Sequence, residues 1–398
     1  MARSSPLFEW APYACAFATI IGALTTIFAG TIGLVQNDFK SIIAYSTCSQ
    51  LGYMITICGL SHYNVGIFHL FNHAFFKALL FLTAGAVIHA LDNEQDVRKF
   101  GGLQQILLFS YTCLLIGNLA LVGTPFLTGF YSKDVILELA FSQYSLSANF
   151  GYALTCFSVL TTSYYSFRLL FLVFHAVKSK TSNLYKQSAI HSHDADYVMI
   201  GVLGFLALGS IYAGWLFKPM FIGLGSDFWN NSIFIMPQQC VMVESEFLPQ
   251  SVKLLPLAAT LLGGVLAYSF IVLRVRWSYD SASRTLRSVY TFLNQRWLYD
   301  KLLNEGIGYP CYKLGFSFVK VFDKGLLELL PVFGVALPRS LQSLSLKLGW
   351  TQSGLIYHYA TIMIFTALCA LTLLSFDSAV LFVDGRVAML MASALIFI

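Results

Sequence analysis

Three ionisable side chains recur at four-residue spacing inside a long apolar segment of this 398-residue chain. They are His69, His73 and Lys77, and the segment that holds them covers residues 65–90. On an α-helix a four-residue step drifts by only about 40°, so the three side chains share one face over roughly 12 Å. The segment is long enough to cross a bilayer, where such groups must face protein or water. This row has the geometry of a proton relay.

Lys77 is the centre of this hypothesis. It lies in the middle of the segment, too far from either end for its ammonium group to snorkel to an interface. A desolvated lysine can switch protonation with modest changes around it, and His73, one turn away, is of the residue type that titrates near neutral pH. The alternative is that Lys77 is satisfied structurally. His69, nearer one end, could likewise be a helix histidine with ordinary partners.

A second polar pair, Lys133 and Asp134, follows the stretch 123–129, which contains Gly123, Pro125 and Gly129. Proline and glycine break helices, so we expect residues 102–141 to form one crossing made of two half-helices. The stretch 123–129 should be non-helical and buried. Broken helices at membrane depth expose free backbone groups that bind or relay ions. The alternative is a charge cluster at a helix start, where the helix dipole favours Asp.

Asp38 lies in the short link before the next apolar run, and residues 45–52 of that run are rich in hydroxyl groups and an amide. Such groups can carry a proton or order water, but they are also common packing groups between membrane helices. We expect Asp38 to pair with a neighbouring basic group.

The composition indicates a polytopic membrane protein. The chain is 57% hydrophobic and 11% charged, with a mean hydropathy of +0.70, whereas soluble domains carry about 25% charged residues. The net charge of +5 sits in short loops and does not indicate binding to nucleic acid. The 8 cysteines are scattered without metal-ligand spacing, which argues against a zinc or iron–sulfur site. The N-terminus does not resemble a signal peptide.

Eight apolar runs are long enough to cross a bilayer: residues 11–35, 41–60, 65–90, 102–127, 151–174, 197–223, 256–273 and 354–375. With 102–141 counted as one crossing, most loop Lys and Arg residues fall on the side opposite the N-terminus. This asymmetry makes that side the matrix or cytoplasmic side. Counting 102–141 as two full crossings would spoil the asymmetry.

Residues 302–348 are apolar throughout but carry regularly spaced charges. This pattern predicts a long amphipathic arm along the membrane surface, interrupted at Pro331 and Pro338. Two short interfacial helices are the alternative. We therefore divide the chain into residues 1–178 with the relay, 179–277 with further crossings, 278–350 with the arm on the matrix side, and 351–398 with the last crossing and a tail.

Six stretches together resemble the proton-pumping, antiporter-like subunits of respiratory complex I, and the resemblance covers essentially the whole chain. They are residues 34–54, 68–90, 95–103, 129–134, 166–171 and 357–359. The resemblance implies an all-α fold with two inverted five-helix repeats, each with a broken helix. This chain matches the second repeat and a C-terminal extension that ends in a lateral helix and a last crossing. It is most similar to the one subunit type in the family that carries this lateral arm.

Functional residues follow from the same resemblance. Lys77 matches the channel lysine, His69 and His73 match channel histidines, Lys133 and Asp134 match an outlet pair, and Asp38 matches a polar channel position. The resemblance implies proton translocation without a cofactor in this chain, while flavin and iron–sulfur clusters belong to partner subunits. The implied partners are the other membrane-arm subunits, including the other antiporter-like ones, and membrane lipids, in the mitochondrial inner membrane.

The chain begins where members of the family are already halfway through. We expect a separate chain to carry the N-terminal half; an incomplete record or processing is the alternative.

Two rival functions also remain. A sodium/proton antiporter subunit has a similar repeat, but the arm argues against it. A structural brace with an inactive channel is opposed by the intact row of His69, His73 and Lys77.

Overall fold

The computed structural model describes residues 1–176, 194, 196–223, 225–230, 232–234, 236, 241–271, 284–327 and 337–375. These ranges are helical apart from their connections, and their one β-type pairing is an isolated bridge between Asp38 and Asp96. The fold is therefore that of an all-α, polytopic membrane protein, as expected. The chain divides into two compact units, Met1–Asp300 and Lys301–Ile398.

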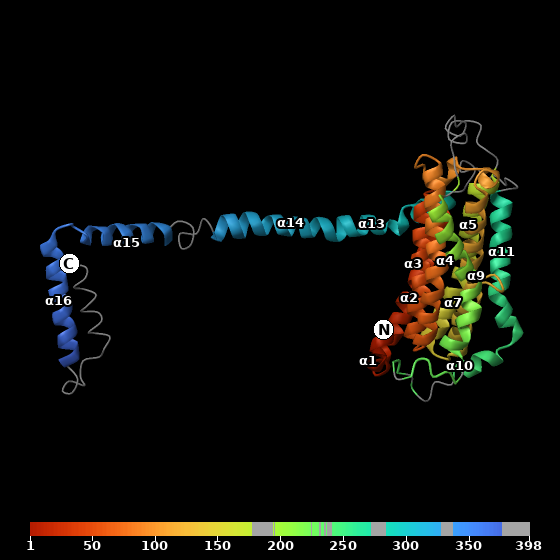
Figure 1. Ribbon diagram of the computed structural model, residues 1–398, viewed down its shortest axis with the longest axis horizontal. Coiled ribbons are helices and arrows are strands. Elements are labelled where there is room, and N and C mark those ends of the chain that lie inside the picture. The colour runs from red at the N-terminus through yellow and green to blue at the C-terminus, as the bar shows by residue number, and fades with distance from the viewer. Residues whose placement is uncertain are drawn as a thin grey trace. The chain divides into compact units, whose positions relative to one another are not determined.

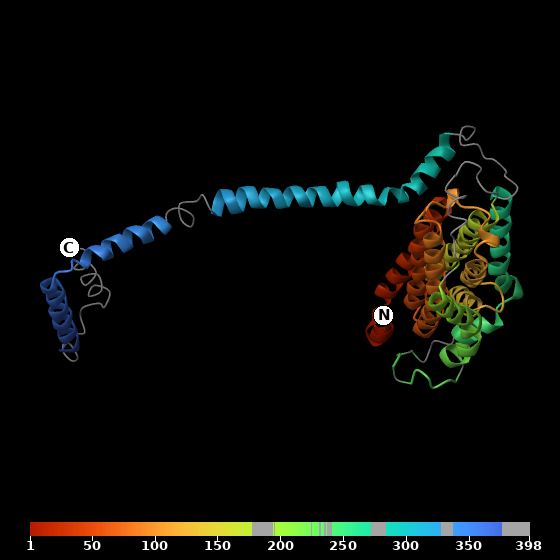
Figure 2. The same ribbon diagram turned by 45° about the horizontal axis from the view of Figure 1, so that its top comes forward.

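Long helices stand side by side in the first unit (Figures 1 and 2). They are α2 (Pro12–Val35), α3 (Phe39–Gly59), α4 (Tyr63–Ala90), α7 (Leu146–Leu170), α9 (Tyr197–Ile222) and α11 (Gln250–Ile271). Short helices α1 (Ser5–Glu9) and α10 (Val241–Glu244) and one-turn segments connect them. Helix α4 packs against α3, α5, α6 and α9, so the relay segment is the centre of the bundle.

Small residues bring α2 and α3 close together. A Cβ added to Gly22 would lie 2.6 Å from the backbone nitrogen of Thr56, and one on Gly59 would lie 2.6 Å from that of Thr19. Close backbone approach at small residues is how membrane helices associate when the hydrophobic effect cannot drive them. This contact fixes α3, which faces the relay on α4.

Five described helices are long and apolar enough to cross a membrane. They are Pro12–Val35, Tyr63–Ala90, Leu146–His175, Tyr197–Ile222 and Gln250–Ile271. The third of these joins α7 to a π-helical turn, Phe171–His175. Helix α3 has 21 residues, which suffices for a crossing of about 20, but its buried Ser46, Ser49 and Gln50 lower its hydropathy.

The broken crossing is present. Helix α5 (Leu108–Val122) ends at Gly123, whose φ is 90°, and α6 (Thr128–Ser142) begins five residues later. The expectation that the whole break is buried is wrong. Gly123 and Thr128 are buried, but Pro125 is exposed and Phe126 is 81% exposed, because the left-handed turn at Gly123 directs the apex outward.

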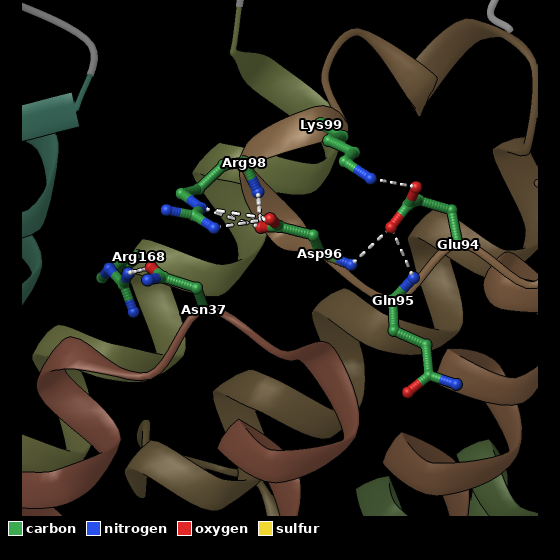
Figure 3. A network of polar contacts seen from close by, with 7 residues as sticks. All are labelled: Asn37, Glu94, Gln95, Asp96, Arg98, Lys99 and Arg168. Atoms are coloured by element: carbon green, nitrogen blue, oxygen red, sulfur yellow. Dashed lines mark hydrogen bonds and ion pairs between the residues drawn. The ribbon is translucent and has the colours of Figure 1, made fainter. Parts of the chain in front are cut away.

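Loops at one end of the bundle form a polar network (Figure 3). Phe39 N donates to Gln95 O at 3.0 Å and Val97 N donates to Asn37 O at 2.9 Å, which joins the α2–α3 and α4–α5 links. Arg98 pairs with Asp96 at 2.7 Å and holds the pKa of that carboxyl below its ordinary value. Lys99 pairs with Glu94 at 2.6 Å.

Arg168 adds helix α7 to this network. Its guanidinium donates to Gln36 O at 2.7 Å and to Asn37 Oδ1 at 3.0 Å (Figure 3). Arg168 is thus a cross-link between α7 and the start of α3, two helices that supply partners to the relay.

Helices α12 (Arg284–Asn294) and α13 (Tyr299–Lys301) lead out of the first unit, where Trp297 packs edge-on against Phe28 with ring centroids 5.4 Å apart. The second unit is helical over η8 (Leu302–Gly308), α14 (Tyr309–Ser317) and η9 (Phe318–Leu327), followed by α15 (Leu337–Thr351) and α16 (Ile356–Ser375). Pro338 does not interrupt a helix. It lies in the first turn of α15, where a missing amide hydrogen is tolerated. Pro331 lies outside the described residues.

Candidate functional site

The three residues of the row lie on one buried face of α4, as their spacing predicts. Lys77, His73 and His69 are 4%, 6% and 0% exposed. The Lys77 ammonium donates to Ser46 Oγ on α3 and lies 5.6 Å from the centroid of the Phe81 ring. Among the described residues no carboxylate lies within ion-pair distance of Lys77. One hydroxyl and one aromatic face compensate only in part for the hydration that a buried cation loses.

His69 connects three helices. Its Nε2 lies 3.1 Å from Gln50 Oε1 on α3, and its Nδ1 lies 2.9 Å from Ser132 Oγ on α6. Because Gln50 presents a carbonyl oxygen, Nε2 donates, and Nδ1 of the neutral ring accepts from the Ser132 hydroxyl. A proton can therefore enter His69 at one ring nitrogen and leave from the other.

His73 occupies the gap between Lys77 and His69. Its ring centroid lies 6.3 Å from that of His69, and Phe76 packs against it edge-on at 5.3 Å. The Nε2 atom of His73 is buried and has no hydrogen-bond partner in the part of the chain that the structure describes. The imidazole is thus positioned by packing, with one nitrogen available for proton transfer.

Lys133 binds the end of the broken helix. It is 1% exposed, and its ammonium donates to Val122 O at 3.3 Å and to Thr162 Oγ1 on α7 at 3.1 Å. The Tyr53 ring lies 5.6 Å away. Val122 is the last residue of α5, where carbonyl groups lack intrahelical partners. The break therefore supplies an oxygen for Lys133, as a broken crossing predicts.

Asp134 is adjacent to Lys133 in sequence but does not pair with it. Neighbouring residues on a helix point about 100° apart, and the half-buried Asp134 carboxylate turns toward Gly123, where an added Cβ would lie 3.8 Å from Oδ1. The two outlet candidates thus contact the broken end of α5 separately.

Asp38 lies away from the row. It directly precedes α3 and accepts a hydrogen bond from Ser41 Oγ at 2.6 Å. Eight residues of helix, roughly 12 Å, separate it from Ser46. The expected ion pair of Asp38 is not found among the described residues, where Arg168, a basic residue at this link, binds Gln36 and Asn37. The Oδ1 atom of Asp38 is buried without a partner.

Sequence reasoning identified part of this site. Ser46 and Gln50 belong to the hydroxyl- and amide-rich run 45–52, for which proton carrying was one of two interpretations. Ser132 and Thr162 were missed. Their signals are weak: Ser132 directly precedes Lys133, and Thr162 lies in a run of three hydroxyl residues. Neither signal indicates which lysine or histidine the hydroxyl contacts.

The contacts form a discontinuous polar path across four helices. It leads from Lys77 and Ser46, through Gln50, His69 and Ser132, to Lys133 and Thr162. Hydroxyl and imidazole groups both donate and accept, which is the property that proton transfer requires. The described residues contain no group of three or more His, Cys, Asp or Glu side chains that could hold a metal ion.

Two family models match the chain. Residues 1–162 match "NADH:quinone oxidoreductase/Mrp antiporter, TM", and residues 165–374 match "NADH dehydrogenase subunit 5 C-terminus". The row of His69, His73 and Lys77 and the broken helix both lie within residues 1–162, the region of the first match.

Relatives from other organisms are similar to this chain over nearly its whole length. The chain is 46% identical to NADH-ubiquinone oxidoreductase chain 5 of Marchantia polymorpha, over 100% of this chain and 59% of the relative. It is 48% identical to the protein of that name from Phytophthora infestans, over 92% of this chain and 55% of the relative. The chain thus spans less than two thirds of the length of these relatives. A solved structure of the Mrp complex from Dietzia sp. DQ12-45-1b aligns with 94% of this chain and 36% of its own, at 19% identity and a TM-score of 0.49.

Proposed function

We propose that this chain, which belongs to the NADH dehydrogenase subunit 5 family, translocates protons as a membrane subunit of a respiratory NADH:ubiquinone oxidoreductase. NADH oxidation and quinone reduction would occur in other subunits, which would hold the flavin and the iron–sulfur clusters. The observation that carries the proposal is the pair of buried lysines on different helices. Lys77 and Lys133 lie at the two ends of a path whose middle is His69, bonded to Gln50 and Ser132.

Each candidate residue takes a role in this proposal. Lys77 stores a proton at the centre of the bundle, and His73 and His69 pass it toward α6. Lys133 receives it at the broken helix, and Asp134 takes part in its release. Asp38, whose Oδ1 is buried and unpaired, would admit protons at the opposite end of α3.

The remaining regions would serve assembly. We propose that residues 179–277 add crossings to the repeat in residues 1–178, and that residues 278–350 form the lateral arm on the matrix side before the last crossing in 351–398. The proposed partners are the other antiporter-like and membrane-arm subunits and the lipids of the mitochondrial inner membrane. The part of the relatives that this chain does not span would supply the other half-channel, whether joined to this chain or separate from it.

Purification of the native assembly from its membranes tests this function. An affinity tag on this chain should recover subunits with flavin absorbance and reduced iron–sulfur signals, together with NADH:ubiquinone activity that pumps protons. Recovery of a sodium-transporting assembly without redox centres would instead support the antiporter alternative and refute the proposal.

A further inference from the structure

Three helices near Lys77 and Lys133 each carry a buried polar atom that has no hydrogen-bond partner among the described residues. The atoms are Nε2 of His73 on α4, Nδ2 of Asn118 on α5 and the hydroxyl of Tyr165 on α7. Their residues are 6%, 6% and 1% exposed. A buried polar atom without a partner destabilises a fold by about 1–3 kcal/mol, so such atoms are few and usually have a function.

Asn118 lies at the level of Lys77. A Cβ on its neighbour Gly117 would lie 3.5 Å from the carbonyl oxygen of Phe76 and 2.8 Å from Leu80 Cδ2, so this turn of α5 packs beside residues 76–80 of α4.

Asn118 also shares a face of α5 with Leu114 and Leu121, since residues three and four apart lie on one side of a helix. Both leucines pack with Phe76, Leu80 and Tyr165 in one buried cluster. Val122, whose carbonyl accepts Lys133, is one turn further along this face. Asn118 therefore lies on the face of α5 that leads from the level of Lys77 to the carbonyl that accepts Lys133.

Tyr165 borders the same region from α7. Its hydroxyl lies beside Ser46, the acceptor of Lys77. Tyr165 is three residues from Thr162, the acceptor of Lys133, so the two side chains share a face of α7. Each lysine thus binds a hydroxyl that neighbours Tyr165.

We propose that Asn118 is a positioning residue that, with Tyr165, orients water between Lys77 and Lys133 and so completes a direct proton route parallel to the route through His69. The proposal rests on the proposed function. A buried water needs two to four polar partners, and His73, Asn118, Tyr165 and Ser46 offer them.

Protons balance along this route. The Lys77 ammonium gives a proton through water to the oxygen of Tyr165 and becomes a neutral amine, while Tyr165 gives its own proton to Thr162. Thr162 passes its hydroxyl proton to Lys133, which must be a neutral amine beforehand and becomes an ammonium. Asn118 carries no proton and acts by orienting the donor.

Replacement of Asn118 by leucine, which is nearly isosteric and apolar, separates this role from packing. If Asn118 only fills space, N118L removes an unpaired amide, so stability and pumping should stay at wild-type level or rise. If Asn118 orients water, the purified, reconstituted complex should assemble normally but translocate protons about tenfold more slowly. N118S, which keeps a hydroxyl and leaves room for water, should retain most of the rate.

Three further variants complete the test. Thr112→Val removes an exposed hydroxyl from the same helix and should change nothing. If the N118L complex does not assemble, Tyr165→Phe, which deletes one oxygen atom, replaces it as the deciding variant. Its proton translocation in the reconstituted complex should then be about tenfold slower. Wild-type translocation in the deciding variant overturns the inference. Lys77→Ala, measured in the same preparation, separates failure of this inference from failure of the proposed function. Normal translocation in Lys77→Ala would overturn the proposed function itself.

Discussion

The two buried lysines have unequal hydrogen-bonding surroundings. An ammonium group has three donors. Lys77 uses one of them on Ser46, whereas Lys133 uses two, on Val122 O and Thr162. Among the described residues, the ammonium of Lys133, at the broken helix, therefore has more hydrogen-bond partners than that of Lys77, at the centre of the bundle.

Ser132 is the residue that joins the histidine row to α6. Ser132→Ala removes the partner of His69 Nδ1 and should slow proton translocation about tenfold, as expected for loss of one oriented transfer step. The measurement is the initial rate of acidification in vesicles that contain the complex.

Ser142 provides a matched control for this variant. It is a buried serine of the same helix, and its hydroxyl bonds only to Leu139 O of its own helix. Ser142→Ala should leave the rate unchanged. Equal rates in the two variants would show that His69 does not work through Ser132.

At the scale of elements, the break between α5 and α6 depends on glycine. Gly129 approaches α5 so closely that an added Cβ would lie 1.8 Å from Ala120 O. Gly129→Ala should therefore force the two half-helices apart, destabilise the fold by about 2 kcal/mol or more, and release Lys133 from Val122. Thermal unfolding of the purified complex and its migration on a native gel measure the effect.

Gly85, in the helix interior of α4, is the control for this prediction. A Cβ there meets nothing within 4 Å, so Gly85→Ala should be neutral or stabilise by about 0.5–1 kcal/mol. A Gly129→Ala complex as stable as the Gly85→Ala complex would mean that the half-helices do not depend on this contact.

Arg168 should stabilise the arrangement of α3 and α7. Arg168→Gln removes two part-buried, charge-assisted hydrogen bonds to the α2–α3 link and should destabilise the first unit by about 1.5–3 kcal/mol. Arg98→Gln removes an exposed ion pair in the same network and should change stability by less than about 1 kcal/mol. Thermal unfolding compares them, and a larger effect at Arg98 would contradict this assignment.

The helices themselves were predictable from the sequence, whereas their partners were not. The spacing of His69, His73 and Lys77 predicts one helix face because helical periodicity is local. Gly123, Pro125 and Gly129 likewise predict a break from local backbone chemistry. The contacts of Lys133 with Thr162 and of Arg168 with Asn37 join residues far apart in sequence, so no local pattern indicates them. The exposure of Phe126 was missed because the direction of the turn depends on the left-handed backbone at Gly123 and at Phe126 itself, and a left-handed phenylalanine is not predicted by its residue type.

At the scale of the whole molecule, the described part of the second unit presents exposed apolar side chains. Leu314, Phe318 and Phe322 are 57%, 52% and 52% exposed along one continuous helical stretch. Large exposed apolar surfaces mark contacts with lipid or protein. The sequence predicted the amphipathic character of this stretch, because apolar residues and charges recur along it. The sequence of this stretch carries no local pattern that identifies what would cover these side chains.

Removal of part of this stretch tests the proposed arm. Deletion of residues 321–340 should release distal membrane-arm subunits, seen as smaller assemblies on a native gel, before it affects the relay in the first unit. A complete assembly with normal pumping would show that the arm neither braces nor couples. A complete assembly that no longer pumps would indicate direct mechanical coupling and contradict a static brace.

Proton translocation by complexes with altered Lys77 tests the central claim most directly. The measurement is acidification of reconstituted vesicles driven by NADH, at matched amounts of assembled complex. Lys77→Ala should assemble but lose most of its translocation, and Lys77→Arg should fail as well, because arginine does not release its proton in proteins. Wild-type translocation in either variant would show that Lys77 is not a proton carrier and would contradict the account.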